Sequence, residues 1–149
     1  MLIAGSGGDT LNGGEHNDFL TGDAGVDFLA GGTGKDIFDF NATTDSGTAF
    51  GSRDFIADFQ VAPGSSTAFE DRFDLPTIDA KAGIPGNDMS TLIGLSGFTG
   101  FTGEGQVRAV QDGVNTLLQF NTTGTGGTEM TITLGDFIAA SLTSADFFE

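Results

Sequence analysis

Four aspartates recur at intervals of nine residues: Asp9, Asp18, Asp27 and Asp36. A large apolar residue stands two places after each of them: Leu11, Leu20, Leu29 and Phe38. This spacing divides residues 4–39 into four nonapeptides with the consensus G-G-x-G-x-D-x-U-x, where U is a large apolar residue. Each repeat therefore combines one carboxylate with glycines, which leave the backbone exposed.

The chemistry that such repeats offer is the binding of a hard cation by oxygen atoms. Glycine permits the tight turn that the G-G-x-G-x-D loop must make, and it leaves carbonyl oxygens uncovered. Calcium takes about six to eight oxygen ligands, including carboxylates and carbonyls. We therefore predict that Ca²⁺ binds between stacked loops, with at least one ion on each edge of the fold. The expected ligands are positions two, four and six of each loop: Gly5, Gly7, Asp9, Gly14, His16, Asp18, Asp23, Gly25, Asp27, Gly32, Gly34 and Asp36.

Short strands must position these loops. In a three-residue x-U-x strand, U points inward and its neighbours outward, because side chains alternate along a strand. Two repeats make one turn of a flattened coil, so the first and third loops should stack on one edge and the second and fourth on the other. A flexible glycine-rich linker is the alternative for residues 4–39. A linker, however, has no reason to keep aspartate and leucine in phase over four repeats.

Some positions in the repeats depart from the consensus. His16 takes the fourth position of the second loop, and Asp23 takes the second position of the third loop, where glycine is usual. Histidine tolerates a left-handed backbone better than most residues, so His16 is predicted to be a turn residue that offers its carbonyl rather than a zinc ligand. Outward-facing Phe19 and Ile37 should share one sheet, and we expect the rest of the chain to pack over them.

Composition narrows the function classes. The chain has 149 residues, of which 21 are acidic and 5 basic, and its net charge of −16 disfavours nucleic acids and anionic membranes as partners. The absence of cysteine excludes disulfides and thiolate zinc sites, and no apolar run approaches the ~20 residues that span a bilayer, so membrane insertion is not expected. A single histidine excludes a His-Glu-x-x-His zinc site. We expect no catalytic residue in this chain.

Residues 40–149 alternate polar loops with short apolar runs, which predicts an all-β architecture. The predicted strands are 54–59, 71–75, 90–94, 106–111, 114–120 and 129–134, and the predicted loops include 41–48, 61–67, 81–88 and 123–127. The pair Asp112-Gly113 between two alternating runs predicts a hairpin. Residues 136–146 predict one or two helical turns.

The nonapeptides resemble the calcium-binding repeats of RTX (hemolysin-type) proteins, and the order of motifs along nearly the whole chain resembles the C-terminal domain of serralysin-type metalloproteases. The motifs behind the second resemblance are "DIFDF" (36–40), "SRDFIADF" (52–59), "EDRFDLPTID" (70–79) and "LGDFIAASLTSADFF" (134–148). The resemblance implies a parallel β-roll over residues 1–40 and an antiparallel β-sandwich-like cap over 41–149, with a type I secretion signal at the end. By the same resemblance Asp54 matches a position near which an additional calcium binds, but a surface acid beside a strand is the favoured interpretation of this residue.

The favoured function is a calcium-gated folding and export module that supports an attached protein. Metal binding and folding would be one event, because the acidic loops repel one another without calcium. The resemblance implies that the partners are calcium, the type I secretion machinery and an upstream catalytic domain such as a metalloprotease, and that the protein is extracellular.

Two alternatives stay open. A polysaccharide-binding module, like those of alginate epimerases, would need a basic strip, whereas residues 1–40 contain only Lys35 as a base. A structural or adhesive segment would belong to a longer array. Residues 1–3 fit positions seven to nine of a preceding repeat, so we expect that the chain begins part-way through such an array.

Overall fold

The computed structural model of the chain describes residues 1–61, 70–75, 78, 91–95, 101, 105–123 and 127–148. The strands in these residues are β1 (Leu2–Ile3), β2 (Thr10–Glu15), β3 (Phe19–Thr21), β4 (Phe28–Thr33), β5 (Ile37–Asp39), β6 (Asp54–Ile56), β7 (Arg72–Asp74), β8 (Thr91–Leu95), β9 (Gln106–Asp112), β10 (Asn115–Asn121), β11 (Met130–Leu134) and β12 (Phe147–Phe148). Short 3-10 helices lie at η1 (Phe50–Ser52), η2 (Ala139–Ser141) and η3 (Ser144–Asp146). The all-β prediction is confirmed, and the last two helices are the predicted turns of 136–146. The predicted loops at 61–67, 81–88 and 123–127 lie wholly or partly outside the described residues.

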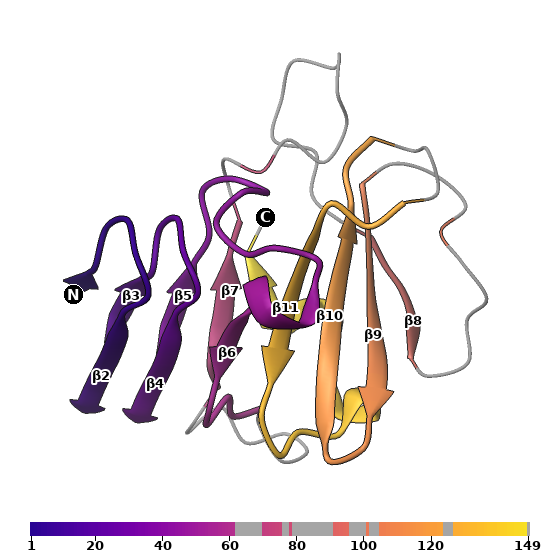
Figure 1. Ribbon diagram of the computed structural model, residues 1–149. Coiled ribbons are helices and arrows are strands. Elements are labelled where there is room, and N and C mark those ends of the chain that lie inside the picture. The colour runs from indigo at the N-terminus through magenta and orange to yellow at the C-terminus, as the bar shows by residue number, and fades with distance from the viewer. Residues whose placement is uncertain are drawn as a thin grey trace.

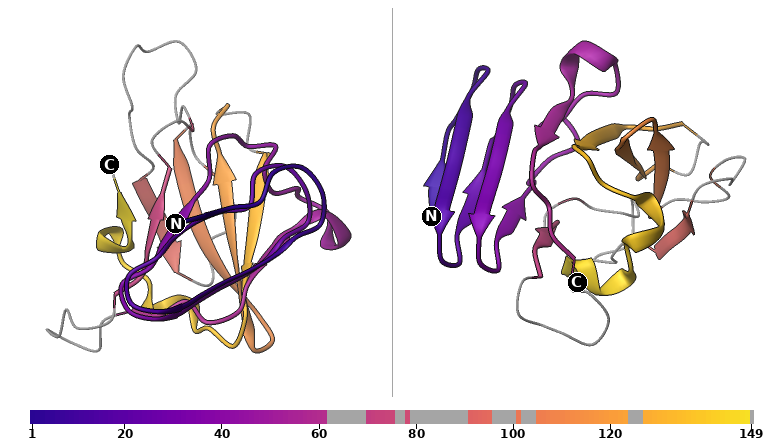
Figure 2. Two further views of the ribbon diagram at one scale, coloured as in Figure 1. Left: turned by 90° about the vertical axis from the view of Figure 1, so that its left-hand side faces the viewer. Right: turned by 90° about the horizontal axis from the view of Figure 1, so that it is seen from below.

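The nonapeptides form a parallel β-roll. Strands β1, β3 and β5 lie side by side in one sheet, and β2 and β4 lie side by side in the other. Seen along the axis of the roll, the coils superpose as a flattened loop (Figure 2). The strands pair at an offset of two repeats, so that Leu11 lies beside Leu29 and Leu20 beside Phe38. The predicted coil of two repeats per turn is confirmed.

Both sheets of the roll continue into the C-terminal part of the chain. Strand β7 pairs in parallel with β5, and β6 pairs in parallel with β4, so neither sheet ends with the last nonapeptide (Figure 1). One sheet then ends with β12, and the other continues through β11, β10, β9 and β8. Strands β9, β10 and β11 are antiparallel, while β6 with β11 and β8 with β9 are parallel pairs. The division into units at residue 40 stays a prediction.

The hairpin between β9 and β10 forms where the sequence predicts it. Asp112 pairs with Asn115 across the turn, and Gly113 has a positive φ of 62°. This conformation is easily reached by glycine, which has no Cβ. The hairpin supplies the antiparallel part of the larger sheet.

The core lies between the two sheets. The inward position of every nonapeptide contributes to it: Leu11, Leu20, Leu29 and Phe38 are 6%, 0%, 0% and 0% exposed. Phenylalanines extend this core beyond the repeats, and the ring of Phe73 stacks on Phe59 (4.5 Å between centroids) and on Phe147 (5.3 Å). In a chain without tryptophan or tyrosine, stacked phenylalanines are the source of large aromatic packing area.

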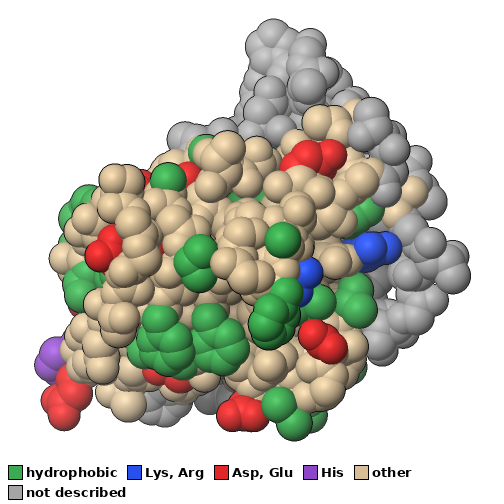
Figure 3. Space-filling model, in the orientation of Figure 1, with side chains coloured by type: hydrophobic (Ala, Val, Ile, Leu, Met, Phe, Trp, Pro, Cys, Tyr) green, Lys and Arg blue, Asp and Glu red, His purple; other side chains and the backbone are tan. Residues whose placement is uncertain are grey.

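The outward positions are only partly covered. Phe19 and Ile37 pair in one sheet, as predicted, but both remain half-exposed rather than buried. On the other sheet Phe28 is 43% exposed and its ring stacks on Phe55 at 5.5 Å. Apolar side chains accordingly gather on the face over β4 and β6 (Figure 3). No helix among the described residues has the length and apolar character needed to cross a membrane.

Candidate calcium sites

The nonapeptide loops stack in pairs at the two edges of the roll. We call these the first edge, made of the loops 4–9 and 22–27, and the second edge, made of the loops 13–18 and 31–36. On the first edge Gly7 and Gly25 form a parallel backbone bridge. A Cβ added at Gly25 would collide with the carbonyl oxygen of Gly7. The loops therefore approach so closely that this position must be glycine.

On the second edge, carbonyl oxygens face the neighbouring loop. The carbonyl oxygen of Gly14 abuts Gly32, and that of His16 abuts Gly34, so a Cβ at either glycine of the later loop would collide with it. These carbonyls belong to positions two and four of the earlier loop. They are placed to offer oxygen to an ion between the loops.

The two non-glycine substitutions adopt the backbone that glycine would adopt. His16 has φ of 84° and Asp23 has φ of 58°. The side chain of His16 is exposed to solvent. The prediction that His16 is a turn residue is consistent with this conformation.

The aspartates form a hydrogen-bonded ladder along each edge. The backbone N–H of Asp9 donates to Oδ1 of Asp27 (2.8 Å), and the N–H of Asp18 donates to Oδ1 of Asp36 (2.8 Å). Each carboxylate thus ties its own loop to the loop of the preceding coil. This use of Oδ1 leaves Oδ2 available for another partner.

The ladder continues beyond the nonapeptides. The N–H of Asp27 donates to Oδ1 of Asp54 (2.8 Å), and the N–H of Asp36 donates to Oδ1 of Asp71 (2.9 Å). The interpretation of Asp54 as a surface acid is wrong, because its side chain is 0% exposed. Asp54 begins β6, which lies between β4 and β11 in the larger sheet. Sequence reasoning assigned no role to Asp71.

The sequence contains a pattern that could have indicated the roles of Asp54 and Asp71 in the ladder. Asp54-Phe55-Ile56 and Asp71-Arg72-Phe73 keep the D-x-U part of the repeat. The glycines that precede the aspartate in the consensus are missing, so neither segment reads as a repeat.

Three buried carboxylate oxygens have no hydrogen-bond partner: Oδ2 of Asp27, of Asp36 and of Asp54. A buried, unpaired charged oxygen is costly, and a bound cation is one way to offset that cost. The first glycine of the loop makes room for these oxygens. A Cβ at Gly22 would lie 2.5 Å from Oδ2 of Asp27, and a Cβ at Gly31 would lie 2.5 Å from Oδ2 of Asp36. These residues therefore fit a calcium ion, and they would supply hard oxygen ligands to it.

The protonation of these carboxyls reflects the same burial. Desolvation raises the pKa of Asp54 and of Asp71 to about 7, against the lowering effect of the ladder hydrogen bonds and with a smaller raising effect of neighbouring carboxylates. Desolvation likewise raises the pKa of Asp27 and of Asp36. Without a cation the ladder therefore holds protons more tightly than ordinary aspartates do.

Backbone oxygen must supply much of any coordination shell. Within the described part of the chain, no group of three or more histidine, cysteine, aspartate or glutamate side chains is arranged to hold a metal. The contribution of carbonyls at positions two and four stays a prediction. The predicted ligand residues all lie in the stacked loops, and their individual roles stay a prediction. Asp9 and Asp18 are less buried than the later aspartates, and the N-terminal amine of Met1 lies 3.6 Å from Asp18.

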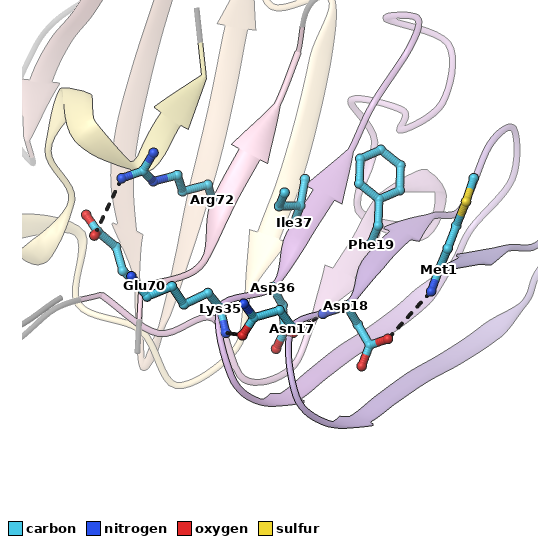
Figure 4. Close-up of a pocket in the computed structure, with 9 residues that line it drawn as sticks. All are labelled: Met1, Asn17, Asp18, Phe19, Lys35, Asp36, Ile37, Glu70 and Arg72. Carbon is cyan, nitrogen blue, oxygen red and sulfur yellow. Dashed lines mark hydrogen bonds and ion pairs between the residues drawn. The ribbon is translucent and has the colours of Figure 1, made fainter. Parts of the chain in front are cut away.

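A hollow of about 510 Å³ lies beside the second edge. It is lined by Met1, Asn17, Asp18, Phe19, Lys35, Asp36, Ile37, Glu70 and Arg72 (Figure 4). Arg72 and Glu70 form an ion pair of 3.6 Å within it. The half-exposed Phe19 and Ile37 belong to its wall.

Comparisons with known proteins agree with the fold. Residues 3–38 match the RTX calcium-binding nonapeptide repeat family in four copies. The solution structure of the AlgE6R3 subunit of the Azotobacter vinelandii mannuronan C5-epimerase is similar over 99% of this chain and 81% of that chain, with a TM-score of 0.56 and 24% identity. The AlgE6R2 subunit of the same epimerase aligns over 99% and 91%, with a TM-score of 0.49 and 21% identity. No curated protein matches the sequence.

The roll, its stacked loops and the family match lead to one assignment. Residues 3–38 match four copies of the RTX calcium-binding nonapeptide repeat, a repeat family that binds Ca²⁺.

Proposed function

We propose that the chain is a calcium-gated folding module that supports the export and extracellular stability of an attached protein. The observation that carries the proposal is that three aspartates of the ladder have a buried carboxylate oxygen without a hydrogen-bond partner. Asp27, Asp36 and Asp54 each keep a buried oxygen without a partner. The folded coil therefore contains negative charge that calcium can neutralise.

Electrostatics opposes folding where calcium is absent. The chain carries a net charge of −16, and its aspartates are stacked in columns along both edges. Calcium that binds only the folded chain stabilises it by RT ln(1 + [Ca²⁺]/Kd), about 2.7 kcal/mol per site when calcium is ~100 times Kd. Two sites would contribute roughly 5 kcal/mol, comparable with the stability of a small domain. Folding would thus follow the calcium concentration.

This behaviour suits a protein that is exported unfolded. Calcium is scarce inside cells and plentiful outside them, so the chain would stay unfolded until it leaves the cell. The resemblance of the later motifs to serralysin-type C-terminal domains supports type I secretion and an upstream catalytic domain such as a metalloprotease. The similar fold of epimerase subunits is compatible with an accessory role beside an enzyme.

Circular dichroism tests the gating. In EGTA the β-sheet signal should be weak, and addition of Ca²⁺ should produce it in one cooperative transition. Magnesium is the control, because it demands tighter octahedral geometry and gives up its water reluctantly. A chain with the same spectrum and the same Tm in EGTA and in calcium would contradict the proposal.

Export needs its own experiment. The chain is expressed in bacterial cells with and without a type I secretion apparatus, and the medium is assayed for it. Accumulation in the medium should require the apparatus. Equal accumulation without it would contradict this route and leave the calcium gating untouched.

Binding of a polysaccharide is a second candidate, favoured by the hollow that Lys35, Arg72 and Phe19 share. Its basic groups face three carboxylates there, those of Asp18, Asp36 and Glu70. An acidic polymer would therefore meet repulsion as well as attraction. Calorimetry with mannuronan oligomers in calcium tests the candidate, with Lys35→Glu as the variant that should abolish binding. Absence of heat with the wild-type chain would exclude it.

A further inference from the structure

Both sheets of the roll have an edge strand at the same end of the molecule. Strand β1 is the edge of the smaller sheet and β2 is the edge of the larger one, whereas β12 and β8 form the opposite edges. The left panel of Figure 2 views the end with β1 and β2 directly. Among the described residues, no strand pairs with the outer side of β1 or β2. We call the surface made of these two strands and the loops 4–9 and 13–18 the open end.

The register of β2 shows which of its backbone groups face outward. The N–H of Phe28 donates to the carbonyl oxygen of Asp9 (2.9 Å), and Phe28 pairs with Thr10. In a parallel pair with this register, Asp9 and Leu11 bond to β4, so the N–H and C=O of Thr10 point to the other side. The same alternation turns the N–H and C=O of Asn12 outward. An uncovered strand edge of this kind is a template for pairing with another chain.

The aspartate ladder also begins at the open end. Within the ladder each carboxylate accepts an N–H from the coil before it, as Asp27 accepts that of Asp9 (2.8 Å). The carboxylates of Asp9 and Asp18 stand first in their columns, and no backbone N–H of the described residues donates to either. The N-terminal amine lies 3.6 Å from Oδ1 of Asp18. The open end therefore presents acceptors where position six of a further coil would carry its N–H donors.

The loops of the open end leave room for another loop. In the later coil, the carbonyl oxygen of Gly7 fills the space beside Gly25. The carbonyl oxygen of Gly14 likewise fills the space beside Gly32. In the first coil, nothing lies within 4 Å of a Cβ position at Gly14, and at Gly7 the atom found is Oδ2 of Asp9 at 3.9 Å. The first coil thus has the shape that accepts the carbonyls of a preceding loop.

The apolar core is least covered at the same place. Leu2 is only half-buried, and Leu11 is 6% exposed, whereas Leu20 and Leu29 are 0% exposed. Ile3, in the edge strand β1, is 58% exposed. The inward apolar residues of an added coil would cover this end of the core, and burial of apolar surface would favour its binding.

We infer that the open end is a docking surface for a coil of G-G-x-G-x-D-x-U-x repeats on another polypeptide, which adds one parallel strand to each sheet. Such strand addition is a common mode of peptide recognition. It continues the stacking by which the coils of the roll already contact one another. One coil of two nonapeptides is the smallest segment that reaches both edges. The inference rests on this stacking and not on the proposed export.

A second copy of this chain fits the open end less well. If two open ends met, the carboxylates of Asp9 and Asp18 would face the same carboxylates of the other copy, and like charges repel. The opposite edges of the sheets, β12 and β8, contain no nonapeptide that could supply the matching donors. The occupant is therefore a nonapeptide coil that no C-terminal strand covers.

A labelled peptide of residues 4–39 tests the docking, because it carries four nonapeptides without the strands that follow them. Fluorescence anisotropy in calcium gives its Kd for the whole chain. Thr10→Pro removes an outward N–H at the first residue of an edge strand, where proline is tolerated, and should weaken binding about tenfold or more. Thr10→Val keeps this N–H and should bind as the wild type does. A peptide with the same residues in scrambled order should not bind.

Three results would overturn the inference. They are equal affinity of Thr10→Pro and Thr10→Val, no binding of the peptide by the wild-type chain, and a dimer of the wild-type chain alone that Thr10→Pro dissociates in sedimentation. If Thr10→Pro fails to fold, hydrogen exchange on the wild-type chain decides. The peptide should slow exchange at the amides of Thr10 and Asn12 and leave those of β10 unchanged, and unchanged exchange at Thr10 would overturn the inference.

The same samples separate this inference from the proposed function. A chain that folds in response to calcium but does not bind the peptide would defeat the docking surface alone. A chain that binds the peptide but has the same circular dichroism in EGTA and in calcium would defeat the proposed gating and support the docking surface.

Discussion

The backbone N–H of Asp27 lies 2.8 Å from Oδ1 of Asp54, and this hydrogen bond joins the third nonapeptide to a segment without the glycine consensus. The same bond joins Asp9 to Asp27 within the repeats. Asp54 thus performs, at the end of the column, the structural task of a repeat aspartate. The physical unit of the roll is the D-x-U strand with its carboxylate, and the glycine loop is one of several ways to connect such strands.

The calcium-free chain should become less stable as pH rises. Burial raises the pKa of Asp54 and Asp71 to about 7 from an ordinary value of 3.8. Such groups bind protons more tightly in the folded state, so their stabilising contribution is present below pH ~4 and is lost as pH rises through ~7. In EGTA, the folded fraction at pH 5.5 should exceed that at pH 8 by circular dichroism. Saturating calcium should remove or reverse this trend, and a trend of the opposite sign in EGTA would refute the prediction.

Gly22→Ala should weaken calcium binding. The added Cβ would lie 2.5 Å from Oδ2 of Asp27 and displace the carboxylate. The calcium midpoint of folding should rise about tenfold or more, equivalent to roughly 1.4 kcal/mol. Gly51→Ala is the control, because nothing lies within 4 Å of its Cβ position and its φ is not left-handed. Equal calcium midpoints for the two variants would contradict the idea that the close approach of Gly22 to the Asp27 carboxylate is needed for calcium binding.

His16→Gly should keep calcium-dependent folding and raise stability slightly. His16 holds φ of 84°, and a left-handed backbone costs a non-glycine residue about 1–2 kcal/mol. His16→Val should destabilise the roll, because a β-branched side chain suits this conformation poorly. Calcium titrations followed by circular dichroism compare the variants. Loss of calcium response in His16→Gly would show that the imidazole, and not the carbonyl, is needed.

Truncation of Phe73 and of Phe28 to alanine should lower the free energy of unfolding by very different amounts. Phe73 is 0% exposed and stacks on two other rings, so Phe73→Ala should cost about 3–5 kcal/mol of the free energy of unfolding. Phe28 is 43% exposed and stacks only on Phe55 among the described rings, so Phe28→Ala should cost about 0.5–1.5 kcal/mol. Urea unfolding in saturating calcium measures both. If both substitutions lowered the free energy of unfolding by similar amounts, the stack of Phe28 on Phe55 would contribute more to stability than its exposure indicates.

The roll could be predicted from sequence because its determinants are local and periodic. Asp9 and Leu11 recur with the same spacing four times, and this phase alone determines which loops stack. The turn at Gly113 could be predicted for the same reason, because it depends only on the adjacent pair Asp112-Gly113. Asp71 is not predicted by the repeat pattern, because its partner Asp36 lies 35 residues away and the residues directly before Asp71 lack the G-G-x-G glycines.

Pairings over still longer distances could not be predicted from local pattern. Strand β6 pairs in parallel with β11, which places Phe55 beside Thr133. This contact depends on the shared core between the sheets and not on a motif in either segment. For the same reason, the local pattern does not predict that both roll sheets continue into the C-terminal part. The repeats end near the predicted boundary at residue 40, whereas both sheets continue past it.

Every carboxylate in the ladder belongs to a later coil than the N–H it accepts, so Asp9 depends on Asp27 and Asp27 on Asp54. Exposure falls in the same direction, to 0% at Asp54. The structure thus has a polarity that its repeats alone would not show. Removal of the C-terminal part would therefore take away the acceptor that Asp54 offers to the N–H of Asp27 and the one that Asp71 offers to the N–H of Asp36.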